Sequence, residues 1–328
     1  MEITERVESA GFPADSFKGV FLLAKGRSLL AKRNLMGWVY VSPWIIGFLC
    51  FQAFPIFYSF YISLHKWDML RKPTFLGLSN YTSLVSDPRF LISLRNTFLF
   101  MLFSMGLGIS LGIFIAALLA EKMKGTHIYR TLFYLPNLVV PVAFGMMMRP
   151  IFAGQDYGLV NIILSRLGVA NFQWLDNPST GIWVVIITNF WFIGACMIIF
   201  LAGIKSINRA YYEAAEIDGA GWFRRFFNIT IPLLGPVIFF QTVSGLIYAL
   251  QIFDIPISLA NLGGSVHTTM GRNDSLASLI FYLYFLGFRE WKMGHASAVG
   301  WVVFLIGLLF TFVIIWVLRR SWYSQDAN

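Results

Sequence analysis

The stretch from Tyr211 to Pro232, YYEAAEIDGAGWFRRFFNITIP, is a polar segment between two long apolar runs. The flanking runs, Asn177–Ile204 and Phe226–Phe253, contain no charged residue. Each exceeds the ~20 apolar residues that a helix needs to cross a bilayer. The segment therefore joins two membrane spans, and it is more elaborate than a simple turn requires.

The same segment predicts a helix, a glycine turn and a second helix. Ala210–Ile217 consists of good helix formers. Gly219 follows, at a position where helices commonly end in the left-handed conformation that glycine adopts without strain. A second short helix is predicted from Trp222 to about Thr230, and Pro232 either ends it or begins the next span.

Side chains of the first helix suit contact with another protein. Ala214 and Ala215 keep this helix thin enough to enter a groove, and Glu213, Arg224 and Arg225 offer charged contacts. A solvated loop of ordinary helix-forming composition explains the same residues equally well. The residue types alone leave both interpretations open.

Composition predicts an all-α, polytopic membrane protein. Of the 328 residues, 57% are hydrophobic and only 12% are charged, against about 25% charged in soluble domains. A charge-free run, Ser275–Phe288, is too short to span and is predicted to lie at the membrane interface or to dip into it. Six longer runs predict six transmembrane helices: Asn34–His65, Asn96–Ala120, Thr131–Met148, Asn177–Ile204, Phe226–Phe253 and Met293–Leu318.

The distribution of Lys and Arg orients these helices. With six spans both chain ends face one side, and that side collects 15 of the 25 Lys and Arg residues. Positively charged loops mark the cytoplasm, so both termini and the loop that carries Glu213 are predicted to be cytoplasmic. The net charge of +9 does not indicate nucleic-acid binding, because the basic residues are scattered.

The chain is predicted to contain one membrane domain with short flanking parts. Residues 1–33 form either an amphipathic helix on the cytoplasmic leaflet or a flexible basic leader. Residues 34–320 form the six-helix domain, within which 205–233 is the polar loop, and 321–328 form a cytoplasmic tail. No hydrophilic stretch is long enough to fold alone.

Two features inside the spans predict breaks and close contacts. Pro136 and Pro141 should kink or break the third span, which places it inside the assembly, where protein or water can satisfy the freed backbone groups. Gly108 and Gly112 form a GxxxG spacing that permits close helix approach, although it also occurs in ordinary glycine-rich spans.

Three groups of residues in the polar segment resemble the signature loop of binding-protein-dependent ABC importer permeases: Glu213-Ala214-Ala215, Asp218-Gly219-Ala220, and Phe226, Ile229, Ile231 and Pro232. Residues 75–97 are also similar to an external segment of sugar-uptake permeases. The resemblance implies that the loop is a coupling helix that docks on an ATP-hydrolysing partner through Glu213, Ala214, Ala215, Asp218, Gly219 and Arg224.

The resemblance also implies the remaining partners of the chain. They are a second permease subunit, usually a different chain, an ATP-binding cassette ATPase dimer, and a soluble solute-binding protein. The implied cargo is an oligosaccharide carried across a bacterial inner membrane by alternating access. Neutral oligosaccharides, glycerol phosphates and acidic oligosaccharides such as alginate fragments all remain open.

Polar side chains inside the fourth and fifth spans predict a substrate path. Such residues are costly in a bilayer and therefore indicate function. Gln241, Ser244 and Tyr248 share one helix face, and that face continues to Gln251. These side-chain types suit sugars, which hydrogen-bond through hydroxyls and stack on aromatic rings. We expect a path lined by Asn189, Trp191, Tyr248 and Gln251; the alternative is hydrogen bonding between helices or contact with the second permease.

The sequence indicates no catalytic role. It has no GxxxxGK[ST] phosphate loop and no defensible hydrolytic constellation. Cys50 and Cys196 lie in apolar runs, and the four His residues are too scattered for a metal site. We therefore expect no cofactor and no metal, and ATP hydrolysis by a partner.

Two other classes of membrane protein require residues that this sequence largely lacks. An ion-coupled secondary transporter needs intramembrane acids and internal repeats, and only Asp254 approaches the first requirement. An intramembrane enzyme needs clustered acids or histidines at one leaflet, which the sequence lacks.

Overall fold

The structure is a computed structural model that describes residues 36–121, 125–154, 157–260 and 269–323. It divides into two compact units, Met1–Tyr61 and Ile62–Asn328. The predicted leader, residues 1–33, lies outside the described residues, as does most of the predicted tail.

The described part of the first unit is helical throughout. The helix starts at residue 36 and continues through a π-helical segment, η1 (Leu49–Ala53), into α3 (Phe54–Ser63). The helix continues through both Pro43 and Pro55. The wider π-turn lies directly before Pro55, where the proline has no N–H to donate.

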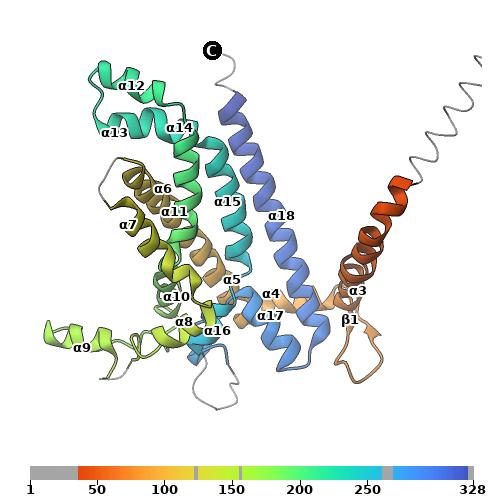
Figure 1. The fold of residues 1–328 in the computed structure, drawn as a ribbon. Helices are drawn as coiled ribbons and strands as arrows, with labels where there is room; N and C mark the ends of the chain where they lie inside the picture. Colours follow the sequence, from red (N-terminus) through yellow and green to blue (C-terminus); the bar gives the residue numbers. More distant parts are fainter. Residues whose placement is uncertain (1–35, 122–124, 155–156, 261–268, 324–328) are drawn as a thin grey trace, which may run out of the picture. The chain divides into compact units, whose positions relative to one another are not determined.

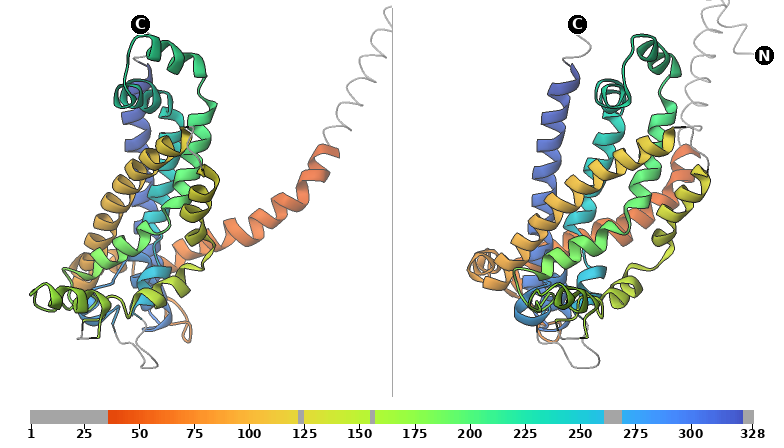
Figure 2. Two further views of the ribbon diagram at one scale, coloured as in Figure 1. Left: turned by 60° about the vertical axis from the view of Figure 1, so that its left-hand side comes forward. Right: turned by 90° about the vertical axis from the view of Figure 1, so that its left-hand side faces the viewer.

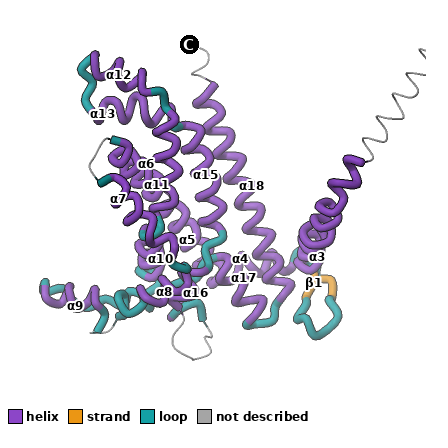
Figure 3. Tube along the Cα trace, viewed as in Figure 1, coloured by secondary structure: helices purple, strands orange, loops and turns teal. Residues whose placement is uncertain are grey.

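The second unit is almost entirely helical (Figure 3). Within its described residues, only β1 (His65–Lys66) and β2 (Thr74–Phe75) form strands, paired antiparallel. The helical segments are α4 (Ser79–Ser86), α5 (Pro88–Phe100), η2 (Met101–Met105), α6 (Gly106–Ala120), α7 (Thr126–Tyr134), η3 (Leu135–Leu138), α8 (Pro141–Met148), α9 (Leu159–Arg166), α10 (Gly181–Phe190), α11 (Ile193–Ser206), α12 (Arg209–Ile217), α13 (Trp222–Arg225), η4 (Phe226–Thr230), α14 (Ile231–Leu233), α15 (Gly235–Leu250), α16 (Asp254–Ala260), η5 (Arg272–Asp274), α17 (Leu279–Phe288) and α18 (Met293–Tyr323).

The expected six spans are found as four long helices and two bent pairs. Among the described residues, the helices long and apolar enough to cross a membrane are Met36–Ser63, Pro88–Ala120, Gly235–Ala260 and Met293–Val317. Helices α7–η3 and α8 form a pair bent by 92°, and α10 and α11 form a pair bent by 45°. The predicted break between Pro136 and Pro141 is therefore confirmed.

The long helices of the second unit run side by side (Figures 1 and 2). The short helices α12 and α13 lie at one end of this bundle, together with the C-terminal end of α18. Helices α8, α9, α16 and α17 lie at the other end. The polar loop and the last span thus end on the same side, as the count of spans requires.

Two hydrophobic clusters hold this bundle together. The larger one joins α5, α10, α15, α16, α17 and α18. The smaller one joins α6 and α11 and extends to Phe226 of the polar loop and to Leu234, directly before α15. A Cβ at Gly112 of α6 would lie 3.0 Å from the Cys196 sulfur of α11, so the expected close approach occurs at Gly112.

A charged network joins α5 to the turn between α17 and α18. Asp87 caps α5 by accepting a hydrogen bond from the Arg89 backbone N–H at 2.8 Å, and the Tyr282 hydroxyl donates to the same carboxylate at 2.7 Å. The Arg89 guanidinium pairs with Glu290 at 2.5 Å, and Lys292 also pairs with Glu290 at 2.7 Å. These contacts connect residues about 200 positions apart in sequence.

Acid is expected to weaken this junction. Burial alone would raise the pKa of Glu290, but hydrogen bonds from Arg89 and Lys292 outweigh it and hold the pKa below its usual value. The pKa of Asp87 is lowered in the same way, with Tyr282 as the main hydrogen-bond donor against burial. A carboxyl with a depressed folded pKa stabilises fully above its unfolded pKa of about 4, and this stabilisation is lost as the pH falls through the folded value.

The Tm of the solubilised protein should therefore be flat from about pH 7 to about pH 5 and fall below that. The variant Glu290→Gln should have a lower Tm at neutral pH and a shallower fall in acid, measured by thermal unfolding in detergent. Parallel profiles for the two proteins would contradict a role for this carboxylate.

Candidate functional site

The polar loop folds as two short helices joined at a glycine. The Asn208 side chain caps α12 by accepting from the Ala210 N–H at 3.0 Å. The helix ends in a Schellman motif, in which the Gly219 N–H donates to Glu216 O and the Ala220 N–H donates to Ala215 O. Gly219 has φ of +73°, so the predicted left-handed turn is confirmed.

Aromatic contacts fix the second helix of the loop to the bundle. The rings of Trp222 and Phe226 stack with centroids 5.1 Å apart. Phe114 of α6 meets both rings edge-on, at 6.0 and 6.4 Å. The Tyr212 hydroxyl lies 2.9 Å from the Thr230 hydroxyl, which joins α12 to η4. These contacts attach the loop to α6.

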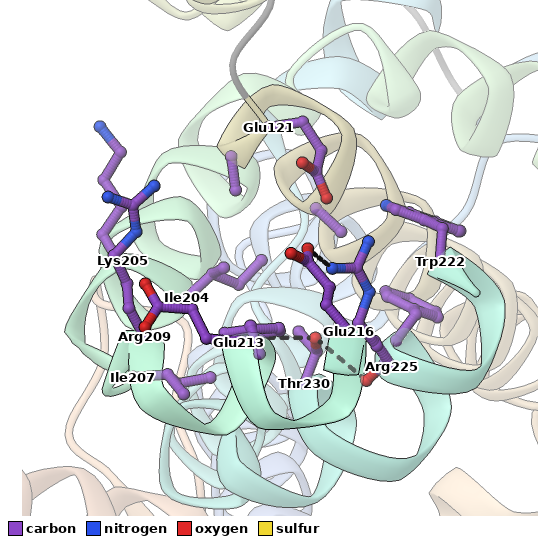
Figure 4. Close-up of a pocket in the computed structure, with 14 residues that line it drawn as sticks. Glu121, Ile204, Lys205, Ile207, Arg209, Glu213, Glu216, Trp222, Arg225 and Thr230 are labelled. Carbon is purple, nitrogen blue, oxygen red and sulfur yellow. Dashed lines mark hydrogen bonds and ion pairs between the residues drawn. The ribbon is translucent and has the colours of Figure 1, made fainter. Parts of the chain in front are cut away.

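A charged hollow of about 590 Å³ lies between the loop and the ends of α6 and α11. Figure 4 shows Glu216 of α12 and Arg225 of α13 pointing toward each other, and they form an ion pair. This ion pair connects α12 to α13 across the glycine turn. The other charged residues that line the hollow are Glu121, Lys205, Arg209 and Glu213.

A second cavity, the inner cavity, has a volume of about 470 Å³ and is bordered by η2, α6, η3, α10, α11 and α15. Its polar residues are Ser104, Asn137, Asn189, Gln241, Ser244 and Tyr248. Three of these side chains form a hydrogen-bonded chain across three spans. The Tyr248 hydroxyl donates to Asn189 Oδ1 at 2.9 Å, and Asn189 Nδ2 donates to Ser104 Oγ at 2.6 Å.

The breaks in the two bent spans meet beside this cavity. Gly194, near the start of α11, lies so close to the Phe133 carbonyl and the Asn137 amide that a Cβ would collide with both. The Asn137 Nδ2 is buried and has no hydrogen-bond partner among the described residues. Buried amide groups without a partner are rare. Because this one lines the cavity, it is a candidate to donate a hydrogen bond to a bound ligand, or to another group of the protein in a different conformation.

Comparison with known protein families decides what this arrangement is. The family described as the binding-protein-dependent transport system inner membrane component matches residues 108–321. This chain belongs to that family. It is therefore a multi-pass permease of an ABC importer, and the family indicated by the polar loop is confirmed.

Whole-length relatives agree. The permease is 38% identical to the probable ABC transporter permease protein YesP of Bacillus subtilis, over 90% of this chain and 94% of that protein. It is 34% identical to the trehalose/maltose transport system permease protein MalF of Thermococcus litoralis, over 87% of this chain and 94% of that one. It also resembles, at a TM-score of 0.73 and 25% identity, a chain of a bacterial ABC transporter involved in the import of the acidic polysaccharide alginate, over 88% of this chain and 96% of that chain.

The loop residues expected to contact a partner lie mostly on the surface of the permease. Glu213, Ala214, Asp218, Gly219 and Arg224 are exposed, and Ala215 is half-buried. Arg225 was expected to be a free polar contact as well, but its side chain turns inward to Glu216. Most of the expected contact residues are thus accessible to a partner, while Arg225 holds the loop together through its pair with Glu216.

Of the four residues expected to line the substrate path, the structure brings two together. Asn189 and Tyr248 line the inner cavity and contact each other. Trp191 lies at the break after α10, outside the lining, with its ring 5.9 Å from that of Phe144. Gln251 lies beyond the last residue of α15, so it leaves the helix face that Tyr248 continues.

Ser104, Asn137 and Gly194 were not among the residues predicted from the sequence. Ser104 and Asn137 were visible as polar residues within apolar runs, the same signal that drew attention to Asn189. Gly194 had no such signal, because only the crossing of α7 and α11 makes a side chain impossible there.

Proposed function

We propose that this permease is one of two membrane subunits of an ATP-driven importer that passes an oligosaccharide from a soluble binding protein to the cytoplasm. The cargo is inferred from the relatives: one is named for trehalose and maltose, and the similar structure belongs to an alginate importer. The inner cavity supports it, because hydroxyl, amide and aromatic side chains line it.

The observation that carries the proposal is the shape and attachment of the polar loop. Asp218 and Gly219 are exposed at the end of a short helix with a stable cap at each end, and exposed Glu213 borders the hollow beside this helix. Phe226 of the loop packs in the hydrophobic cluster formed by α6 and α11. We infer that an ATPase docks on the exposed residues, and that closure of the ATPase dimer tilts the spans through the packing of Phe226.

The orientation and remaining partners belong to the same proposal. Both termini and the loop 205–233 lie in the cytoplasm, and residues 34–320 form the permease domain. The second permease is a different chain. The comparisons give no support to an ion-coupled secondary transporter.

Replacing Glu213 with alanine tests the docking face. Glu213 is exposed and has no hydrogen bond or ion pair among the described residues, so its loss should leave the Tm of the permease unchanged. In proteoliposomes that contain the whole transporter, uptake and binding-protein-stimulated ATP hydrolysis should both fall about tenfold, which corresponds to about 1.4 kcal/mol. Glu213→Asp keeps the charge and should retain most of both activities.

Full uptake and full stimulated hydrolysis in the alanine variant would refute docking through this residue. Uptake that persists without ATP but is abolished by an ionophore would refute ATP-driven import and indicate ion coupling instead.

A further inference from the structure

The short helix α9 is amphipathic in the opposite sense to a helix that faces water. All of its residues are described, and the buried one among them is polar, since Asn161 is 0% exposed. Leu159 and Ile163 are 54% and 62% exposed, and Leu167, directly after the helix, is 71% exposed. These three residues are spaced four apart, so they form one apolar ridge on the side of the helix away from Asn161.

Hydrogen bonds of Asn161 fix this orientation. Its Nδ2 donates to the carbonyl oxygens of Ala153 at 3.3 Å and Phe172 at 3.0 Å. Its Oδ1 accepts from the Phe172 N–H at 3.2 Å and from the Trp174 indole N–H at 2.8 Å. These bonds use the full hydrogen-bonding capacity of the amide. They tie α9 to the segments before and after it, with the polar side turned inward and the apolar ridge turned outward.

The position of α9 places it at the edge of the membrane. In the chain it lies between α8 and α10, and each of these belongs to a bent pair of helices that can form one span. Figures 1 and 2 show α9 at the end of the bundle opposite the polar loop, running across the direction of the long helices. In Figure 1 it also projects beyond α6 and α7. A helix in this position runs along the membrane surface and does not cross the bilayer.

The residues around the apolar ridge favour lipid over water or another protein. Residues 157–175 include no Asp or Glu, and their one charged residue, Arg166, is exposed. Tyr157 is exposed and Trp174 half-buried, and both residue types are enriched where a bilayer meets water. Protein interfaces usually have a polar rim, but along the fully described helix α9 the exposed polar side chains are only Ser165 and Arg166. Aliphatic side chains beside a cation complement acyl chains below anionic head groups.

We propose that α9 is an interfacial helix whose apolar ridge lies among the acyl chains of the lipids and whose Arg166 contacts anionic head groups. Helices of this kind bury their apolar face about 5–10 Å into the boundary between head groups and acyl chains. The contact holds the chain between α8 and α10 at a fixed depth. It lies in the leaflet opposite the polar loop, which is the outer leaflet in the proposed orientation.

The accessibility of a nitroxide to two relaxing agents tests this contact. The complete transporter is reconstituted in vesicles of phosphatidylethanolamine and phosphatidylglycerol. Ile163, Leu167 and Ser165 are replaced one at a time by p-acetylphenylalanine, to which the nitroxide is attached; Ser165 is the matched control, exposed on the side of α9 away from the ridge. Oxygen concentrates among acyl chains, whereas a water-soluble nickel chelate stays outside them. The ratio of oxygen to nickel accessibility should be about threefold or more higher at Ile163 and Leu167 than at Ser165.

Two results would overturn the proposal. High nickel accessibility at all three positions would show that the apolar ridge faces water. Low accessibility to both agents at Ile163 and Leu167 would show that another protein, such as the second permease, covers it. Uptake by each labelled transporter shows that it is assembled, and Leu159 is a further ridge position if one of the labelled chains does not assemble. Neither result bears on ATP-driven import, which is tested separately at Glu213.

Discussion

Replacing Gly194 with alanine is expected to abolish uptake and to prevent most of the permease from reaching its folded state. The added methyl group would lie on the Phe133 carbonyl and 2.7 Å from the Asn137 amide nitrogen. The first of these is backbone and cannot turn away, so α11 would have to separate from α7. We expect a cost at or above the upper end of the about 1–3 kcal/mol that overpacking usually causes.

Gly106 provides the matched control for this substitution. It also lies in an apolar span, but a Cβ built on it meets no atom of the chain within 4 Å. Gly106→Ala should therefore leave yield, Tm and uptake close to those of the wild type. The measurements are monodisperse yield by size-exclusion chromatography, thermal unfolding in detergent, and uptake in proteoliposomes. Equal Tm values for the two variants would show that α7 and α11 are not in contact as described.

Replacing Arg89 with leucine is expected to give the second large effect, a loss of about 2–3 kcal/mol of stability, typical of a lost hydrogen bond to a charged partner. Leucine also loses the contact of the guanidinium with the Tyr282 and Phe285 rings, over which it lies at 5.8 and 5.7 Å. It removes the positive charge that Asp87 and Glu290 share, so two partly buried carboxylates lose their common partner. Uptake should fall with stability, because α5 begins the span that carries the cavity.

Arg95 makes a suitable comparison because it lies on the same helix. It is exposed and forms no ion pair within the part of the chain that the structure describes. Arg95→Leu should change the free energy of unfolding by less than about 0.5 kcal/mol, and the Tm correspondingly little. The test is thermal unfolding of both variants at neutral pH. An equal loss of stability in the two would show that the ion pairs of Arg89 with Asp87 and Glu290 contribute no more than a single surface charge.

The sequence was sufficient for features that depend on local chemistry. Charge-free runs identified the spans because lipid permits few charges there, and Gly219 marked the turn because few other residues adopt its positive φ. The break in the third span followed from Pro136 and Pro141, since neither can donate a backbone hydrogen bond. None of these inferences required knowledge of which helices are neighbours.

Features that depend on helix neighbours could not be predicted. The partnership of Arg89 and Glu290 joins residues about 200 positions apart, and nothing in either local sequence indicates it. The inner cavity was only partly foreseen for the same reason. Gln251 follows the spacing of Tyr248 as far as helical periodicity can tell, but α15 ends one residue before it. Helix ends are set by the packing around them as well as by the local sequence.

The wide turn η2 has a consequence for how this protein can diversify. A π-turn accommodates about one residue more than an α-turn, so it rotates all later side chains by about 100°. One continuous helix can therefore place Ser104 at the inner cavity and, farther along, pack Gly112 and Ala116 against α11. Under the proposed function, this helix would contact the cargo near η2 and the helix that leads to the polar loop farther along, so substitutions near Ser104 could alter specificity without changing the packing at Gly112 and Ala116.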